Sequence, residues 1–194
     1  MNLTNNIPLR EQNIVLIGFM GVGKTTIGQL IANKLYRDFI DIDHEIESRH
    51  GMSVKDIFSQ KGEAWFREEE RNVIRELCTK TRLKVISLGG GAFMQEEVRE
   101  ICLSTSLVFF LDLSWDSWKQ RLHLISSTRP VLENRSLQDI EELFYKRQNL
   151  YAFNHSTIST DQMNAEDAAE YIINTLKVSW DIYEPRAPLV FERE

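Results

Sequence analysis

One short segment limits the fold of this chain more than any other. It reads Gly18-Phe-Met-Gly-Val-Gly23-Lys24-Thr25 and matches the pattern G-x-x-x-x-G-K-[ST] at every position. Glycines let a backbone turn tightly around an anion, so that successive N–H groups and the positive end of the next helix can bind phosphate. The lysine adds a mobile positive charge, and the threonine hydroxyl is placed for Mg²⁺. The segment therefore predicts a phosphate-binding loop between a strand and a helix.

The rest of the chain alternates short apolar runs with helical patterns, as such a loop requires. Strands are predicted at 14–17, 39–42, 85–88, 107–113 and 157–160, and helices at 24–36, 43–49, 53–60, 64–81, 115–124, 137–151 and 165–176. This alternation predicts a parallel sheet with helices on both faces and ligands at the carboxyl ends of the strands. From residue 178 onward the chain has no periodicity, and we expect an irregular extension there, either packed through its aromatic residues or loose.

Composition narrows the class of protein. The 194 residues suit one α/β domain, and 42% of them are hydrophobic, which is enough for a packed core. The net charge is −6 and no basic tract is present, so a nucleic-acid binder is not expected. No apolar run is long enough for a membrane helix, and the first residues do not resemble a signal peptide. Cys78 and Cys102 lack metal-ligand spacing, and we expect reduced thiols in a cytoplasmic protein.

Phosphate-binding loops occur in GTPases, motors, ATPases and small-molecule kinases. A GTPase would need Asn-Lys-x-Asp, but Asn33-Lys34 is followed by Leu35-Tyr36. Asp41 and Asp43 stand at alternate positions of an extended segment, so both carboxylates can face the site. One can help to hold hydrated Mg²⁺ while the other accepts a hydrogen bond from an attacking hydroxyl. An aspartate-rich turn without such a role is the alternative.

Further motifs follow the loop in a fixed order. They are Asp41-Ile42-Asp43, Phe66-Arg67-Glu68-Glu69-Glu70, Ser87-Leu88-Gly89-Gly90-Gly91, Arg129-Pro130 and Arg147. Taken alone, an arginine on a charged helix is usually solvated and three glycines usually form a loop. The complete set resembles the shikimate kinase family, and the match covers residues 13–176, nearly the whole chain.

The resemblance implies a fold and a reaction. The fold is α/β, a three-layer domain of the nucleoside-monophosphate-kinase type with a five-stranded parallel sheet in the order 2-3-1-4-5. We expect that domain at 13–177, with a mobile lid at about 121–136 and extensions at 1–12 and 178–194. The reaction transfers the γ-phosphoryl group of ATP to the 3-hydroxyl of shikimate, on the route to chorismate and the aromatic amino acids. Family members are usually monomers, so we expect shikimate and ATP as the only partners.

The resemblance also assigns roles to residues. Asp43 corresponds to the base that holds the shikimate hydroxyls, and Thr25 and Asp41 correspond to the Mg²⁺ site. Lys24 contacts the outer phosphates, and Arg129 matches the lid arginine that closes over them. The remaining nucleotide contacts are expected from Gly21, Val22, Gly23, Thr26 and, through stacking on adenine, Arg121.

The carboxylate of shikimate is expected between two arginines, Arg67 and Arg147, because a guanidinium binds a carboxylate with two parallel hydrogen bonds. Backbone N–H groups of Gly89, Gly90 and Gly91 would complete that pocket. Glu70 matches a family acid that orients neighbouring groups. Asp112, which ends an apolar run, imitates a metal-binding acid, and we interpret it as structural.

Three other functions fit the sequence less well. A kinase of the same fold for another small molecule, such as gluconate, would not need two arginines beside the paired aspartates. A binding protein that has lost catalysis should lack Lys24, Asp43 or an arginine that grips a carboxylate, and all of these are present. An adenylate-type kinase would need a second phosphate site, which nothing here supplies. Release of ADP with and without shikimate distinguishes these hypotheses.

Overall fold

A computed structural model of the protein describes residues 7–122 and 136–183. Its centre is a sheet with the strand order β2-β3-β1-β4-β5, in which every neighbouring pair is parallel. The strands are β1 (Asn13–Ile17), β2 (Asp38–Asp41), β3 (Lys84–Ser87), β4 (Ser106–Asp112) and β5 (Ser156–Ser159). The predicted number and order of strands are therefore confirmed.

The central strand β1 is apolar along its length because both of its faces are covered. All five of its residues are buried, and Ile14 pairs with Val85 on one side and with Leu107 on the other. Each buried aliphatic side chain of this kind stabilises the fold by roughly 1.5–3 kcal/mol. This strand ends directly before the glycine-rich segment, so the packed core fixes the base of the loop.

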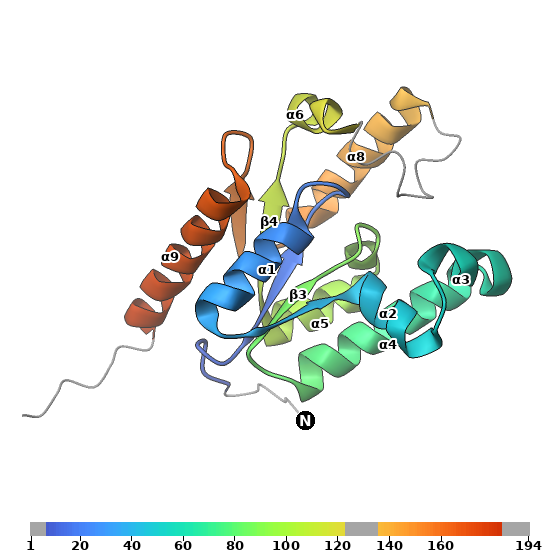
Figure 1. The fold of residues 1–194 in the computed structure, drawn as a ribbon. Coiled ribbons are helices and arrows are strands. Elements are labelled where there is room, and N and C mark those ends of the chain that lie inside the picture. The colour runs from blue at the N-terminus through green and yellow to red at the C-terminus, as the bar shows by residue number, and fades with distance from the viewer. Residues whose placement is uncertain (1–6, 123–135, 184–194) are drawn as a thin grey trace, which may run out of the picture.

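Helices cover the sheet on both faces (Figure 1). In front of it, α1 (Lys24–Leu35) packs against α9 (Ala165–Tyr183), while α4 (Glu63–Lys80) and α5 (Glu96–Thr105) pack together behind. Two short helices, α2 (Ile42–His50) and α3 (Val54–Lys61), pack on α4. The remaining elements are α6 (Trp115–Gln120), α8 (Leu137–Tyr151) and the 3₁₀ turn η1 (Ala92–Met94). This is the expected three-layer arrangement.

Local signals explain several helix boundaries. Ser136 and Asp139 form a reciprocal capping box at the start of α8, and the Ser53 side chain accepts from the N–H of Asp56 at the start of α3. Such caps satisfy N–H groups that the first helical turn leaves without partners. Helix α8 therefore has the predicted bounds.

Helix α5 was not predicted, since no element was assigned between the three glycines and the fourth strand. Val98 and Cys102 are its buried residues, one turn apart, and the rest of the helix is more exposed. Two buried positions in ten residues are too few to produce a clear helical period. The helix forms because these two side chains complete the packing between α4 and β4.

The expectation of an irregular tail from residue 178 was wrong for its first residues, because α9 continues to Tyr183. The Trp180 ring explains the continuation. Arg10 and Arg37 lie against that ring, with guanidinium carbons 6.0 and 5.7 Å from the centroid. Arg37 also donates to the carbonyl groups of Arg10 and Gln12 at 2.6 and 2.7 Å. The last turns of α9 are thus packed against the N-terminal segment.

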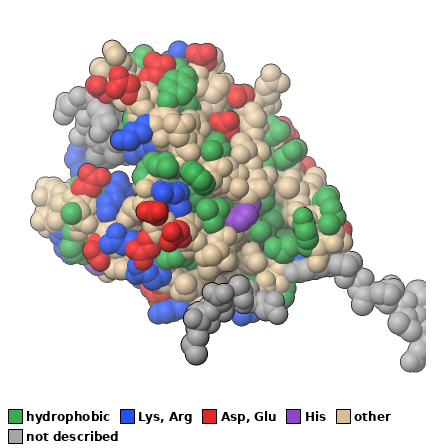
Figure 2. Space-filling model, turned by 180° about the vertical axis from the view of Figure 1, so that it is seen from behind, with side chains coloured by type: hydrophobic (Ala, Val, Ile, Leu, Met, Phe, Trp, Pro, Cys, Tyr) green, Lys and Arg blue, Asp and Glu red, His purple; other side chains and the backbone are tan. Residues whose placement is uncertain are grey.

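The surface carries charges of both signs, which lie side by side on the rear face (Figure 2). Many of them form ion pairs between helices, such as Arg49 with Glu76 at 2.9 Å and Arg71 with Glu97 at 3.4 Å. Within residues 7–122 and 136–183, no helix is long and apolar enough to cross a lipid bilayer.

Candidate active site

The glycine-rich segment connects β1 to α1 as predicted, and its glycines have distinct physical reasons. Gly23 precedes α1 with φ of 102°, and Gly18 has φ of 145°; both values strain any residue with a Cβ. A Cβ on Gly18 would also lie only 2.7 Å from the carbonyl oxygen of Leu111. The loop therefore needs glycine both for its dihedral angles and for its closeness to β4.

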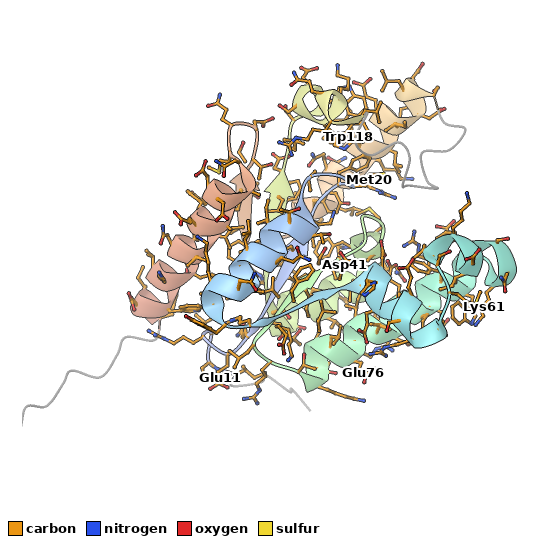
Figure 3. All side chains as sticks on the ribbon, viewed as in Figure 1. Glu11, Met20, Asp41, Lys61, Glu76 and Trp118 are labelled. Carbon is orange, nitrogen blue, oxygen red and sulfur yellow. The ribbon has the colours of Figure 1, made fainter. Side chains whose placement is uncertain are left out.

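Hydrogen bonds from two side chains hold the backbone of the loop in place. Lys24, which is 8% exposed, donates through Nζ to the carbonyl oxygens of Gly18 and Phe19 at 2.8 and 2.9 Å. Trp118 donates from Nε1 to the next carbonyl, that of Met20, at 2.7 Å, and these two residues lie at the same end of the molecule (Figure 3). Three successive carbonyl groups thus accept bonds from side chains, so the loop is ordered by its own protein contacts.

Thr25 and Asp41, the predicted metal residues, are in direct contact. The Thr25 hydroxyl donates to Oδ2 of Asp41 at 3.0 Å, while Oδ1 of Asp41 accepts from the N–H groups of Asp43 and His44 and caps α2. A hydroxyl and a carboxylate oxygen suit Mg²⁺, which usually keeps several waters and binds phosphate oxygens. The described part of the chain holds no group of three His, Cys, Asp or Glu that could bind a metal. These two oxygens therefore fit a partly hydrated Mg²⁺ rather than a closed protein site.

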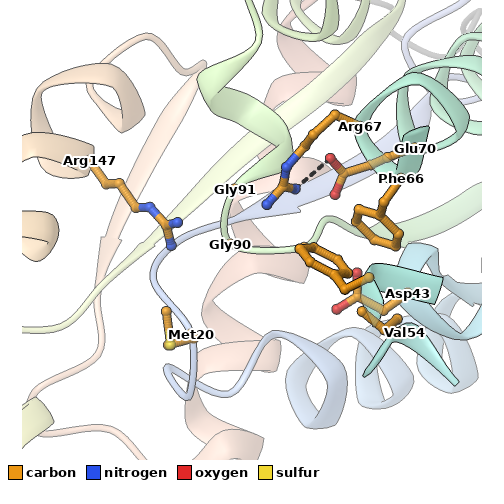
Figure 4. Close-up of a pocket in the computed structure, with 11 residues that line it drawn as sticks. Met20, Asp43, Val54, Phe66, Arg67, Glu70, Gly90, Gly91 and Arg147 are labelled. Atoms are coloured by element: carbon orange, nitrogen blue, oxygen red, sulfur yellow. Dashed lines mark hydrogen bonds and ion pairs between the residues drawn. The ribbon is translucent and has the colours of Figure 1, made fainter. Parts of the chain in front are cut away.

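A cavity lies beside the loop (Figure 4). Its apolar wall comes from Met20, Val54, Phe58 and Phe66, and its charged lining from Asp43, Arg67, Glu70 and Arg147. The two arginines reach it from opposite sides, one from α4 and one from α8, as Figure 4 shows. Two guanidinium groups facing one small cavity suit a ligand that carries a carboxylate.

Gly89, Gly90 and Gly91 follow β3 and form one wall of this cavity. None of the three has a positive φ, so backbone freedom does not explain them. A Cβ on Gly89 would lie 2.8 Å from Oδ1 of Asp43, one on Gly90 would lie 3.3 Å from Nη1 of Arg147, and one on Gly91 would lie 2.8 Å from Nη2 of Arg67. A Cβ on Gly89 would also lie 3.0 Å from Oε1 of Glu70. Each glycine therefore makes room for charged groups of the site.

Arg67 is held by a carboxylate that is entirely buried. Its Nη1 donates to Oε2 of Glu70 at 2.7 Å, and Glu70 is 0% exposed. Burial raises the pKa of Glu70 to about 7; the positive charge of Arg67 opposes this increase, and the negative charge of Asp43 adds to it. Because a buried ion pair is costly to break, Arg67 is fixed in direction before any ligand binds.

Arg147 is also buried, with 7% of its surface exposed. Its guanidinium carbon lies 5.5 Å from the centroid of the Phe19 ring, a favourable position for a cation. Burial raises the pKa of Tyr151, one turn further along α8, and the positive charge of Arg147 opposes this. The Tyr151 hydroxyl donates to the carbonyl oxygen of Gly90 at 2.6 Å. Arg147 and the glycine wall are thus connected through one tyrosine.

A second cavity lies over the glycine-rich loop. Lys24, Thr25 and Asp41 line it. The two cavities share a boundary formed by Met20, Asp43, Gly89 and Gly90. A carboxylate at that boundary can face a phosphate on one side and a hydroxyl on the other.

The structure therefore brings most of the predicted residues into one cleft. The second cavity includes Gly21, Gly23, Lys24, Thr25, Thr26, Asp41 and Asp43, and the first includes Asp43, Arg67, Gly89, Gly90, Gly91 and Arg147. Val22 lines neither cavity, and its side chain is buried. Arg121 follows α6 directly, and Arg129, with most of the expected lid, lies outside the described residues.

Asp112 has structural partners. Its Oδ1 accepts from Gln148 at 3.2 Å, and its carbonyl oxygen accepts from the N–H of Thr160 at 2.8 Å. Sequence reasoning did not identify the apolar wall of the first cavity or Gln95, whose side chain reaches Glu70 at 3.0 Å. The apolar residues belong to ordinary helical patterns, and a single glutamine carries no motif.

The sequence and the overall fold are both similar to those of known proteins. The family model described as "Shikimate kinase" matches residues 20–177. The chain is 62% identical over 180 residues to the shikimate kinase of Geobacillus thermodenitrificans, covering 92% of this chain and 96% of that protein. It is 55% identical over 185 residues to the shikimate kinase of Bacillus subtilis, covering 95% and 100%.

Among solved structures, the shikimate kinase from Acinetobacter baumannii in complex with shikimate superposes with a TM-score of 0.80. That protein is 36% identical, and the match covers 87% of this chain and 94% of the other. The shikimate kinase from Aquifex aeolicus superposes with a TM-score of 0.76 at 34% identity, covering 86% of this chain and 97% of the other.

Proposed function

The chain belongs to the shikimate kinase family, and on that premise we propose how its own residues phosphorylate shikimate with ATP. The activity is transfer of the γ-phosphoryl group of ATP to shikimate, a step in the biosynthesis of aromatic compounds. The observation that carries the residue assignments is the position of Asp43, which lines both cavities. The two cavities take one substrate each.

Shikimate occupies the first cavity. Arg67 and Arg147 bind its carboxylate, and the apolar wall of Val54, Phe58 and Phe66 packs against its ring. The backbone of Gly89, Gly90 and Gly91 lies against the substrate. This orientation directs a ring hydroxyl, which we assign as the 3-hydroxyl, toward Asp43 at the boundary of the two cavities.

The phosphates of ATP occupy the second cavity. The backbone from Gly21 to Thr26 and the Nζ of Lys24 bind them, because N–H groups at the start of α1 and a lysine both favour negative charge. We assign Arg121 to the adenine and Arg129 to the transferred phosphoryl group, on the basis of the family resemblance. Positive charge at that phosphoryl group stabilises the transition state.

Asp43 is the base in this proposal. It accepts the proton of the shikimate hydroxyl while the hydroxyl oxygen forms a bond to the γ-phosphorus and the bond to the bridging oxygen of ADP breaks. The transferred group is then carried by shikimate, and ADP leaves. Because positioning contributes much of the rate in such reactions, the fixed arginines contribute to catalysis as well as the base.

Thr25 and Asp41 would hold Mg²⁺, since their hydroxyl and carboxylate oxygens are already neighbours at 3.0 Å. When bound, the ion neutralises charge on the phosphates. The protein contributes the direction of these oxygens, which the cap of α2 fixes.

A coupled assay of ADP release tests the proposal. We expect rapid release with ATP, Mg²⁺ and shikimate, and little release when shikimate is omitted or replaced by gluconate. EDTA should abolish the rate. Equal ADP release with and without shikimate would contradict the assignment of the first cavity.

We further propose that the enzyme acts as a monomer in the cytoplasm, without nucleic acid or membrane partners. Cys78 and Cys102 are buried free thiols, which suits a reducing compartment. Light scattering should give a mass near 22.7 kDa, and a mass twice as large would contradict the monomer.

A further inference from the structure

A side-chain amide outside the cavity reaches the buried carboxylate that lines it. Gln95 directly precedes α5 and does not line either cavity. Its Nε2 lies 3.0 Å from Oε2 of Glu70, and its Oε1 accepts from Nη1 of Arg71 at 3.3 Å. Arg71 in turn pairs with Glu68 and Glu97 at the surface. Gln95 is therefore a bridge between a surface ion network and the site.

The chemistry of its two neighbours fixes the direction of this amide. An ionised carboxylate can only accept hydrogen bonds, and a guanidinium can only donate them. The opposite orientation would place the Gln95 oxygen against Glu70 and its NH₂ group against Arg71, so both contacts would be repulsive. A side chain with a donor and an acceptor on one rigid plane is thus required, and glutamine provides it.

The hydrogen bond from Gln95 determines which partners each carboxylate oxygen of Glu70 has. Oε2 accepts from both Arg67 and Gln95, at 2.7 and 3.0 Å. Oε1 is buried and has no hydrogen-bond partner among the described residues. It lies 3.0 Å from the place where a Cβ on Gly89 would stand, close to Asp43. Two donors on one oxygen hold the carboxylate plane and keep the other oxygen directed toward the cavity.

We propose that Gln95 is a positioning residue for shikimate, which acts through Glu70 by holding this carboxylate ionised and in the one orientation that aims Arg67 at the substrate carboxylate. The inference rests on the proposed role of Arg67 in binding shikimate. Gln95 itself touches neither substrate, so its effect passes through Glu70 alone.

The charges around Glu70 give the direction of the effect. Arg67 from α4 and Arg147 from α8 favour the ionised carboxylate, whereas burial and Asp43 from α2 favour the protonated one. A neutral N–H that donates to a carboxylate favours its ionised form. Without Gln95, a larger fraction of Glu70 is protonated near neutral pH, and Arg67 loses its opposite charge.

Gln95→Leu tests this, because leucine fills similar space without hydrogen-bonding groups. We expect the KM for shikimate to rise about five-fold, which corresponds to about 1 kcal/mol, the net contribution of one ordinary hydrogen bond, with the KM for ATP unchanged. The acidic limb of the pH profile of kcat/KM for shikimate should move to higher pH. Gln95→Glu, which places a second carboxylate beside Glu70, should shift both quantities further in the same direction and serves if the leucine variant fails to fold.

Arg99→Leu is the matched control. Arg99 supports the same turn through bonds to the carbonyl groups of Phe93 and Met94 at 3.2 and 2.9 Å. It should lower the melting temperature and leave the KM for shikimate unchanged.

A double-mutant cycle decides whether the effect passes through Glu70. In a Glu70→Gln background, Gln95→Leu should no longer change the KM for shikimate. An equal change in that background, or equal changes in KM for both substrates, would overturn the inference and leave Gln95 a structural residue. If Arg67→Ala raises the KM for shikimate and Gln95→Leu does not, only the present inference falls. If Arg67→Ala also has no effect, the proposed substrate site falls with it.

Discussion

The phosphate loop and the neighbouring cavity are built in opposite ways. The loop takes its residues from one continuous segment, 18–26, and its glycines are needed for backbone geometry, with φ of 145° at Gly18 and 102° at Gly23. The cavity collects charged side chains from α2, α4 and α8, and its glycine wall leaves space for those side chains. A site made from backbone is specified locally, whereas a site made from side chains depends on the packing of distant elements.

Asp43 belongs to both regions, so its loss should have the largest effect. Asp43→Asn keeps the shape of the boundary and removes the base. We expect kcat to fall by about 10²–10⁴-fold, while the Kd values for ATP and shikimate change little. Rapid-quench measurement of the first turnover checks the chemical step, and a kcat within three-fold of the parent would show that the two regions work without a shared base.

Arg67 should affect the cavity and not the loop. Arg67→Ala should weaken shikimate binding by about 1.5–3 kcal/mol, the value of a charge-assisted hydrogen bond, and leave ATP affinity unchanged. Arg67→Lys should recover only part of this loss, because an ammonium cannot form the paired contact. Calorimetric titration with each ligand gives both affinities. Equal losses of affinity for ATP and shikimate would contradict the assignment of the two ligands to separate cavities.

A pair of matched substitutions compares the two kinds of glycine. Gly18→Ala places a Cβ against the carbonyl of Leu111 at a strained φ and should cost about 1–3 kcal/mol in the free energy of unfolding. Gly91→Ala has no positive φ to strain and meets only the guanidinium of Arg67, which Glu70 holds, so stability should fall by less than for Gly18→Ala while the KM for shikimate rises about ten-fold or less. Urea denaturation and steady-state kinetics on both variants test this. Similar losses of stability for the two variants would show that Gly91, like Gly18, is required by the backbone geometry.

The pH dependence of stability should give the smallest effect. The pKa of Glu70 is raised to about 7 from the model-compound value of 4.5, so between these values the folded protein binds more protons than the unfolded chain. Stability from this group therefore falls as pH rises from about 4.5 through 7. Between pH 5 and 8, the parent should lose about 1–3 kcal/mol relative to Glu70→Gln. Denaturation curves at both pH values check this, and parallel curves would contradict the raised pKa.

The contrast between the loop and the cavity also explains how much of the structure the sequence could predict. The loop was predicted from eight consecutive residues, and the strand order was correct, because local motifs and strand–helix alternation carry that information. The burial of individual side chains in the cavity could not be predicted from local motifs. Glu68, Glu69 and Glu70 are consecutive, yet their side chains are 65%, 23% and 0% exposed, and no local pattern separates the third from the others.

Two features were missed for related reasons. Helix α5 has only Val98 and Cys102 as buried anchors, so its period was too weak to recognise. The end of α9 is stabilised by Arg10 and Arg37 around Trp180, a contact between opposite ends of the chain. Gln95 was missed for the same reason, because its proposed role depends on Glu70, which lies 25 positions away in the sequence.

The common boundary of Met20, Asp43, Gly89 and Gly90 has a consequence for inhibitor design. A single compound with a carboxylate on one arm and a phosphate mimic on the other could extend past Asp43 and fill both chambers. Joining the two arms loses translational freedom once instead of twice, so the linked molecule should bind far more tightly than either fragment. The linker must be slender where it passes Gly89, since even a methyl group there would touch Asp43.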